Sequence, residues 1–205
     1  CSRPSALVQL LPGRRVIAQE MPDGSSLGRL NDVLADGRGG AWVTQGALWH
    51  IASDGSVTKV YEPEAFTNGL ATSPDNSTLY VTDMRTIHAF DLDSEGSASN
   101  ARVFASLDED SEGFGGDGMT VDSEGRLYVT GDAGVYVFAG DGGKLGVIPV
   151  PRRSITLAFA GPDRGTLYVG AMGAATPDGE AWETPEGVRN VAMTIYKLDT
   201  LSSGM

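Results

Sequence analysis

The sequence predicts an all-β protein of the propeller type, chiefly because one phrase occurs in it four times. The copies are Val33–Thr44, Leu70–Thr82, Met119–Thr130 and Leu157–Gly170. Each reads as a short apolar strand, a turn rich in Asp, Gly or Pro, and a second strand of aromatic-Val-Thr or aromatic-Val-Gly. β-rich repeats that recur every ~40 to 50 residues are typical of propeller blades.

A second, outer pair of strands is expected after each of the first three copies, which completes three blades of four strands. These pairs are Ala47–Ile51 with Val57–Tyr61, Ile87–Leu92 with Ala101–Phe104, and Val135–Phe138 with Leu145–Val150. The fourth copy is followed by a loop, Ala174–Asn190, and by a single strand, Met193–Leu198. The last blade is therefore expected to lack its fourth strand.

The chain opens with an outer pair, Ala6–Leu11 and Arg15–Gln19, that has no inner pair of its own. We expect residues 1–205 to form a single, incomplete propeller domain of about four to four and a half blades, with an N-terminal blade segment absent. Alternatively, the opening hairpin folds onto the last blade and closes a smaller ring. An open ring exposes blade faces and edges, which predicts self-association or a complementing segment that covers them.

Composition and charge narrow the class of partner. Of 205 residues 40% are hydrophobic, which is ordinary for one globular domain, and the formal net charge is −12. The acidic residues lie in turns such as Asp91–Glu95 and Asp108–Glu112. Such a surface repels phosphate backbones and anionic lipid, which argues against nucleic acid or a membrane as partner.

Two further observations concern the environment of the protein. No apolar run approaches the ~18 to 20 residues that a membrane-spanning helix needs, so a soluble protein is expected. The lone cysteine, Cys1, excludes an internal disulfide and leaves the redox compartment open.

Oxygen-bearing side chains precede three of the four copies, where the innermost strand of each blade begins. They are Asn31, Asn68 and Asp117, and the fourth copy has Ile155 there. Side chains at one repeat-equivalent position converge on the propeller axis, and oxygen ligands suit a hard cation. The alternative is that each residue only starts a turn, because Asn and Asp tolerate left-handed geometry.

Three phrases carry a resemblance to a known family. Arg29–Asp32 (RLND), Thr67–Leu70 (TNGL) and Gly116–Met119 (GDGM), in this order, resemble the regucalcin, gluconolactonase and luciferin-regenerating-enzyme family. The strand Thr194–Leu198 resembles its closing strand. The resemblance implies a six-bladed propeller with one divalent metal, calcium by preference, with zinc, magnesium or manganese as alternatives.

The same resemblance implies a role for each residue of the site. Asn68 and Asp117 correspond to metal ligands, Asp117 is also the candidate general base, and Arg29 and Asn31 correspond to substrate-binding residues. The family's early Glu ligand, in a Glu-Gly-Pro phrase, has no match in this sequence.

The function predicted on this basis is a metal-dependent hydrolase that resembles gluconolactonase. The cation polarises the carbonyl of a small, sugar-type lactone, and Asp117 assists the attacking water. Hydrolysis of organophosphates is a related possibility. The alternative is a non-catalytic propeller that binds a metal or a small ligand, or a platform for protein interaction.

The two histidines and the repeated aromatic residues are expected to be structural. His50 and His88 fall in outer strands, away from the predicted site. Packing between adjacent blades is expected of Trp42, Trp49, Tyr80, Tyr128 and Tyr168.

Overall fold

The computed structural model of the chain describes residues 5–107, 115–174, 176, 178, 183–184, 187–188 and 193–205. In this part of the chain the regular elements are all β-strands. Cys1 and the turn Asp108–Glu112 lie outside the described residues. Among those described, there is no helix with the length and apolarity that a membrane crossing requires.

Three antiparallel sheets of four strands form complete blades. The first consists of β3 (Val33–Ala35), β4 (Ala41–Gln45), β5 (Ala47–Ile51) and β6 (Val57–Tyr61). The second consists of β7 (Thr67–Thr72), β8 (Thr78–Asp83), β9 (Thr86–Leu92) and β10 (Ala98–Ser106). The third consists of β11 (Met119–Val121), β12 (Leu127–Gly131), β13 (Gly134–Phe138) and β14 (Lys144–Pro149). Each sheet runs in sequence order, as hairpin-connected strands do.

The remaining strands form a three-stranded blade and two hairpins. The last blade has β15 (Ser154–Ala160), β16 (Thr166–Met172) and β19 (Met193–Asp199), with β16 in the centre. The opening hairpin is β1 (Leu7–Gln9) with β2 (Arg15–Ala18). A short pair, β17 (Glu183–Thr184) with β18 (Gly187–Val188), lies in the segment predicted as loop.

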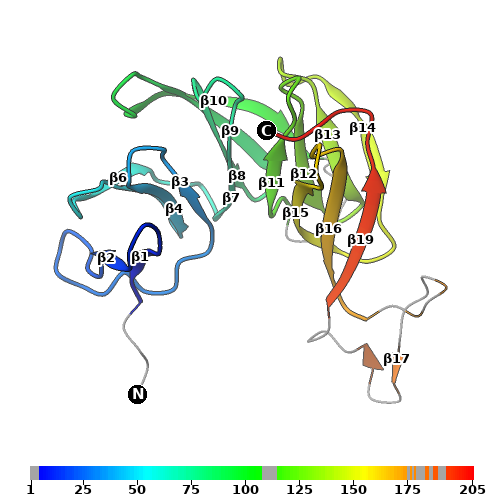
Figure 1. Ribbon diagram of the computed structural model, residues 1–205, viewed down its shortest axis with the longest axis horizontal. Helices are drawn as coiled ribbons and strands as arrows, with labels where there is room; N and C mark the ends of the chain where they lie inside the picture. The colour runs from blue at the N-terminus through cyan, green and yellow to red at the C-terminus, as the bar shows by residue number, and fades with distance from the viewer. Residues whose placement is uncertain are drawn as a thin grey trace.

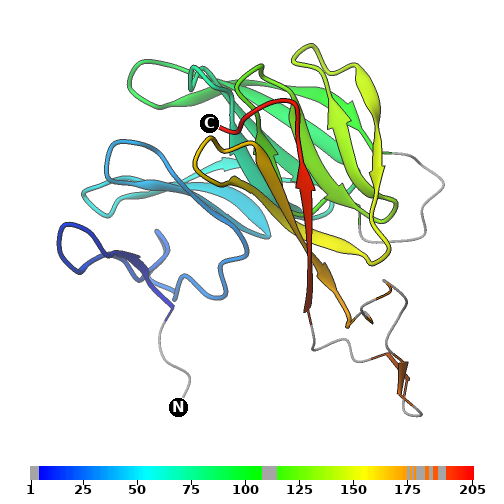
Figure 2. The ribbon, with the colours of Figure 1, turned by 45° about the vertical axis from the view of Figure 1, so that its right-hand side comes forward.

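The sheets follow one another along an arc, from the opening hairpin to the last blade (Figures 1 and 2). The first strand of each blade lies on its inner side: β7 contacts β3 and β11, and β11 contacts β15. The predicted all-β propeller with about four blades is confirmed.

Apolar clusters fill the space between neighbouring sheets. Leu7 and Ala18 of the opening hairpin pack on Val43 and Ile51 of the first blade. Trp42 packs with residues of the second blade, and equivalent clusters join the second blade to the third and the third to the last. Because side chains alternate between the two faces of a strand, each complete blade buries both faces.

The last blade differs, because one of its faces is exposed. Tyr168 is 38% exposed and Ile195 is 71% exposed, whereas Leu167 and Val169 on the other face are fully buried. The prediction that Tyr168 packs between blades is therefore wrong. Its side chain points to the face on which, among the described residues, no further blade packs.

The end of the chain turns back onto the third blade. Gly204 forms an antiparallel bridge with Asp122, and the backbone N–H of Ser123 donates to the carbonyl of Ser203 at 2.8 Å. The segment after β19 therefore links the last blade to the third.

Candidate functional site

Asn31, Asn68 and Asp117 meet at the inner edge of three consecutive blades, and we call them the axial cluster. Asn31 Nδ2 donates to Asn68 Oδ1 at 2.5 Å, and the Asn68 side chain hydrogen-bonds to the Asp117 carboxylate. Asn68 Nδ2 also lies 3.3 Å from the carbonyl oxygen of Gly116. Three residues separated in sequence therefore form one hydrogen-bonded group, as their repeat-equivalent positions predicted.

The backbone beneath the axial cluster is held by three fully buried threonines, Thr44, Thr82 and Thr130. Thr44 Oγ1 donates to the carbonyl of Asn68 at 2.7 Å and accepts the N–H of Asp32 at 3.0 Å. The other two bond to the glycines that follow Asn68 and Asp117, at 2.8 and 3.1 Å. Sequence reasoning did not assign these threonines a role, although each ends a repeated aromatic-Val-Thr phrase.

The glycines that follow Asn68 and Asp117 allow the inner strands to approach closely. A Cβ on Gly69 would lie 2.0 Å from the carbonyl oxygen of Asp117, and one on Gly118 would lie 2.9 Å from that of Ile155. Neither glycine has a positive φ, and Asn68 lies inside β7. The alternative that Asn68 only starts a turn is therefore wrong; the glycine after it is required by interblade packing.

Asp117 is the ionisable member of the axial cluster, and its pKa is strongly shifted. Partial burial raises the pKa of its carboxyl to about 6, from an ordinary 3.8. The positive charge of Arg153 and the hydrogen bond from Asn68 lower this pKa, whereas the negative charge of Asp32 raises it. A carboxylate with a pKa near 6 is a better base than an exposed one, which is a feature of catalytic sites.

The neighbouring Asp32 has a structural role. Its two carboxylate oxygens accept the backbone N–H groups of Val33 at 2.8 Å and Leu70 at 2.9 Å. Because these amides belong to the first and second blades, Asp32 ties the two inner strands together. Arg29 is exposed and lies in the segment that leads to Asn31; its substrate-binding role stays a prediction.

The donor set of the axial cluster suits a hard cation. It offers one carboxylate and two amide oxygens, which are the ligands that calcium prefers. The carboxylate is partly desolvated and accepts a hydrogen bond from the Asn68 side chain, whose oxygen faces Asn31. Within the described residues, no group of three or more His, Cys, Asp or Glu side chains could hold a metal ion, so a cation here would rely on the amides and on water.

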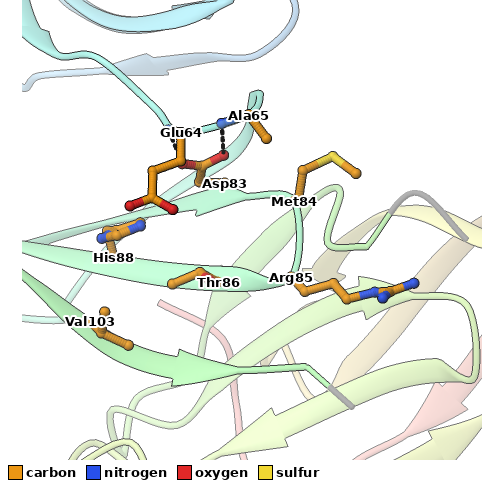
Figure 3. A pocket seen from close by; sticks show the side chains of 8 residues that line it. All are labelled: Glu64, Ala65, Asp83, Met84, Arg85, Thr86, His88 and Val103. Carbon is orange, nitrogen blue, oxygen red and sulfur yellow. Dashed lines mark hydrogen bonds between the residues drawn. The ribbon is translucent and has the colours of Figure 1, made fainter. Parts of the chain in front are cut away.

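A cavity of about 400 Å³ lies elsewhere, on the second blade (Figure 3). Its lining includes Glu64, Asp83, Arg85 and His88, and none of its lining residues belongs to the axial cluster. Asp83 is buried and accepts the backbone N–H groups of residues 64–66 at 2.9, 3.3 and 2.8 Å. Its carboxylate therefore anchors the loop before β7.

His50 lies in β5 and His88 in β9, and each side chain has a polar partner. His50 Nε2 lies 3.0 Å from the Asp36 carboxylate, and His88 Nε2 lies 3.2 Å from the Tyr61 hydroxyl. Neither is part of the axial cluster, which agrees with the structural role expected of them.

The comparisons with known proteins place this chain in a family. The family described as "SMP-30/Gluconolactonase/LRE-like region" matches residues 7–173. The chain belongs to this family, the one that the three phrases around Asn31, Asn68 and Asp117 indicated.

Individual relatives are longer than this chain. A pentonolactonase of Haloferax volcanii is 33% identical over 188 residues, which are 86% of this chain and 64% of that protein. A regucalcin of Xenopus laevis is 35% identical over 61% of this chain and 44% of its own length. The solved luciferin-regenerating enzyme is 26% identical, with a TM-score of 0.70, over 86% of this chain and 63% of its own. The chain thus spans less than two thirds of these relatives.

Proposed function

We propose that this protein is a metal-dependent hydrolase that opens small, sugar-type lactones. The observation that carries the proposal is the axial cluster, in which a half-buried carboxylate and two asparagine side chains from consecutive blades meet. Family membership supports the same reaction class, and the Haloferax relative is named a pentonolactonase.

In this proposal Asp117 and Asn68 hold a divalent cation, calcium before zinc, magnesium or manganese, because all their donors are oxygens. When bound, the cation supplies Lewis-acid polarisation of the lactone carbonyl. Asn31, which already donates to Asn68 at 2.5 Å, keeps that amide oriented and presents its own oxygen to the substrate. The exposed Arg29 offers a guanidinium that can bind the hydroxyl groups of a sugar ring.

The reaction then needs one proton acceptor. Water adds to the carbonyl carbon as Asp117 takes up its proton, and the ring C–O bond breaks when the addition intermediate collapses. The proton passes to the leaving alkoxide, so an open-chain hydroxy acid is formed and Asp117 is ionised again. Without a cation, burial raises the pKa of the Asp117 carboxyl to about 6. A bound cation would lower this pKa and make Asp117 a weak base, so polarisation of the carbonyl would supply most of the rate.

The test is hydrolysis of a panel of aldonolactones with calcium and with a chelator. Asp117→Asn removes the proposed base and ligand, and we expect a loss of about 100-fold or more in kcat/KM. Asp141→Asn is the matched control, because Asp141 is an exposed carboxylate in a hairpin turn that accepts one N–H at 2.9 Å. Equal activity of wild type and Asp117→Asn would contradict the proposal.

A second candidate is a non-catalytic propeller that binds a cation or a small ligand. The observation that favours it is the presence of a single carboxylate in the axial cluster. The same experiment separates the two functions: calcium that binds through Asp117, without turnover of any lactone in the panel, would favour the binding protein.

A further inference from the structure

The fourth blade contributes its own charged residue beside the axial cluster, although not at the repeat-equivalent position. That position holds Ile155, and the charged residue is Arg153, two residues earlier. The Gly118 N–H donates to the carbonyl of Ile155 at 3.0 Å, which brings the start of β15 against the Asp117–Gly118 segment. Arg153 therefore comes from the chain segment that enters the fourth blade next to this contact.

The backbone of Arg153 is firmly fixed. Its carbonyl accepts the N–H of Met172 at 2.8 Å. The next residue, Ser154, is 1% exposed, and its hydroxyl bonds to the carbonyls of Gly131 at 3.2 Å and Gly134 at 2.9 Å. These bonds tie the start of β15 to the β12–β13 turn, so the Arg153 side chain projects from a rigid base.

Among the described residues, Arg153 interacts electrostatically with the carboxylates of Asp132 and Asp117. Arg153 Nε lies 3.7 Å from Asp132 Oδ1, a carboxylate on the β12–β13 turn. Asp117 directly precedes Gly118, whose N–H bonds to the carbonyl of Ile155 at 3.0 Å, and the charge of Arg153 acts on the Asp117 carboxyl. Arg153 is 33% exposed and Asp132 is 21% exposed, so this group is partly shielded from solvent.

We propose that Arg153 is an internal cation that competes with the metal for Asp117, and that Asp132 holds Arg153 aside when a metal binds. This inference rests on the proposed function, because it takes Asp117 as a metal ligand. Two cations beside one carboxylate repel each other, and the repulsion is large in a partly desolvated site. The charge of Arg153 thus lowers the metal affinity of a site in which the axial cluster provides a single carboxylate.

Calorimetric titration of the full chain with calcium chloride tests the competition. Arg153→Gln removes the charge, and we expect calcium to bind about tenfold more tightly. Arg153→Lys keeps the charge, so its affinity is expected to stay within about twofold of wild type. Asp132→Asn releases Arg153 toward Asp117 and is expected to weaken calcium binding about threefold.

The matched control is Arg152→Gln. This neighbouring arginine donates to the carbonyl of Ala174 at 3.3 and 2.9 Å, and we expect no change in calcium affinity when it is replaced. An equal gain in Arg152→Gln and Arg153→Gln would mean a general effect of surface charge and would overturn the proposal. Unchanged or weaker binding by Arg153→Gln would overturn it as well.

A double variant shows whether the gain in calcium affinity depends on Asp117. In Asp117→Asn, the further change Arg153→Gln is expected to bring no gain in calcium affinity, and a gain that persists would contradict the competition for Asp117. If Arg153→Gln does not fold, Arg153→Met, which keeps the aliphatic stem, gives the same comparison. Lactone turnover is not part of these readouts, so failure of the hydrolase proposal would appear separately, as calcium binding without activity.

Discussion

Asp117 and Asp122 are five residues apart in the third blade, yet the fold shifts their pKa values in opposite directions. Asp117 is half-buried, and the pKa of its carboxyl rises to about 6 because burial outweighs its favourable contacts. Asp122 is fully buried, but hydrogen bonds outweigh the effect of burial and lower its pKa.

The partners of Asp122 explain the difference. Its carboxylate accepts the side chain of Arg126 at 2.7 Å and the hydroxyl of Tyr128 at 3.0 Å, as well as two backbone N–H groups. Asp117 has the Asn68 side chain and the charge of Arg153 instead. A buried carboxylate that is fully hydrogen-bonded stabilises the fold, whereas one that is partly satisfied remains available for chemistry.

The largest expected effect follows from removing the charge of Asp122. Asp122→Asn should lower the free energy of unfolding by about 2 to 4 kcal/mol, because it leaves Arg126 without its buried partner. Urea denaturation at neutral pH measures the change. Asp141→Asn, at an exposed turn, should stay within about 0.5 kcal/mol of wild type. Equal losses in Asp122→Asn and Asp141→Asn would show that Asp122 contributes no more to stability than an exposed aspartate.

Removing the charge of Asp117 should stabilise the protein, whereas removing the charge of Asp122 should destabilise it. In the presence of chelator, Asp117→Asn is expected to raise the free energy of unfolding near pH 7.5 by about 1 to 2 kcal/mol, a value reduced from the full shift because the carboxyl is partly exposed. A raised pKa favours the folded state at low pH, and this contribution is lost between about pH 4 and pH 6.

The pH series is the control for this prediction. The advantage of Asp117→Asn over wild type should vanish below about pH 4, where the carboxyl is protonated in both folded and unfolded chains. An advantage that is constant from pH 4 to pH 8 would show that burial does not raise the pKa of Asp117.

A smaller loss is expected when the support beneath the axial cluster is removed. Thr44→Val deletes the hydroxyl that bonds to Asn68 and Asp32 and should cost about 1 to 2 kcal/mol of stability. The proposed lactonase activity should fall about tenfold in protein that is still folded, because Asn68 loses its position. Thr58→Val, at an exposed position of β6, is the matched control and should leave both quantities unchanged.

The smallest effects on stability are expected at two repeat-equivalent tyrosines. Tyr128→Phe removes a donor from Asp122 and should cost about 1 kcal/mol. Tyr168→Phe, on the exposed face of the last blade, should lie within about 0.5 kcal/mol of wild type. Thermal melts of the two variants measure this difference, and an equal loss in both would mean that the exposed face is covered in solution.

Much of this architecture follows from local sequence patterns. The bounds predicted for β5 and β6 are those observed, because alternation of side chains and the Ser-Asp-Gly turn between the strands fix a hairpin locally. The repeat also aligned Asn31, Asn68 and Asp117, and repeat-equivalent positions in a propeller occupy equivalent places around the axis. Sequence therefore determined the blades and the three members of the axial cluster.

The tertiary structure determined the packing and the electrostatic environment of these residues. The approach of β7 to the carbonyl of Asp117, which requires Gly69, is a distance between blades that no local pattern contains. The same holds for the position of Arg153 beside Asp117 and for the opposite pKa shifts of Asp117 and Asp122. Desolvation and charge interactions depend on every group nearby in space, so they are set only when the blades have packed.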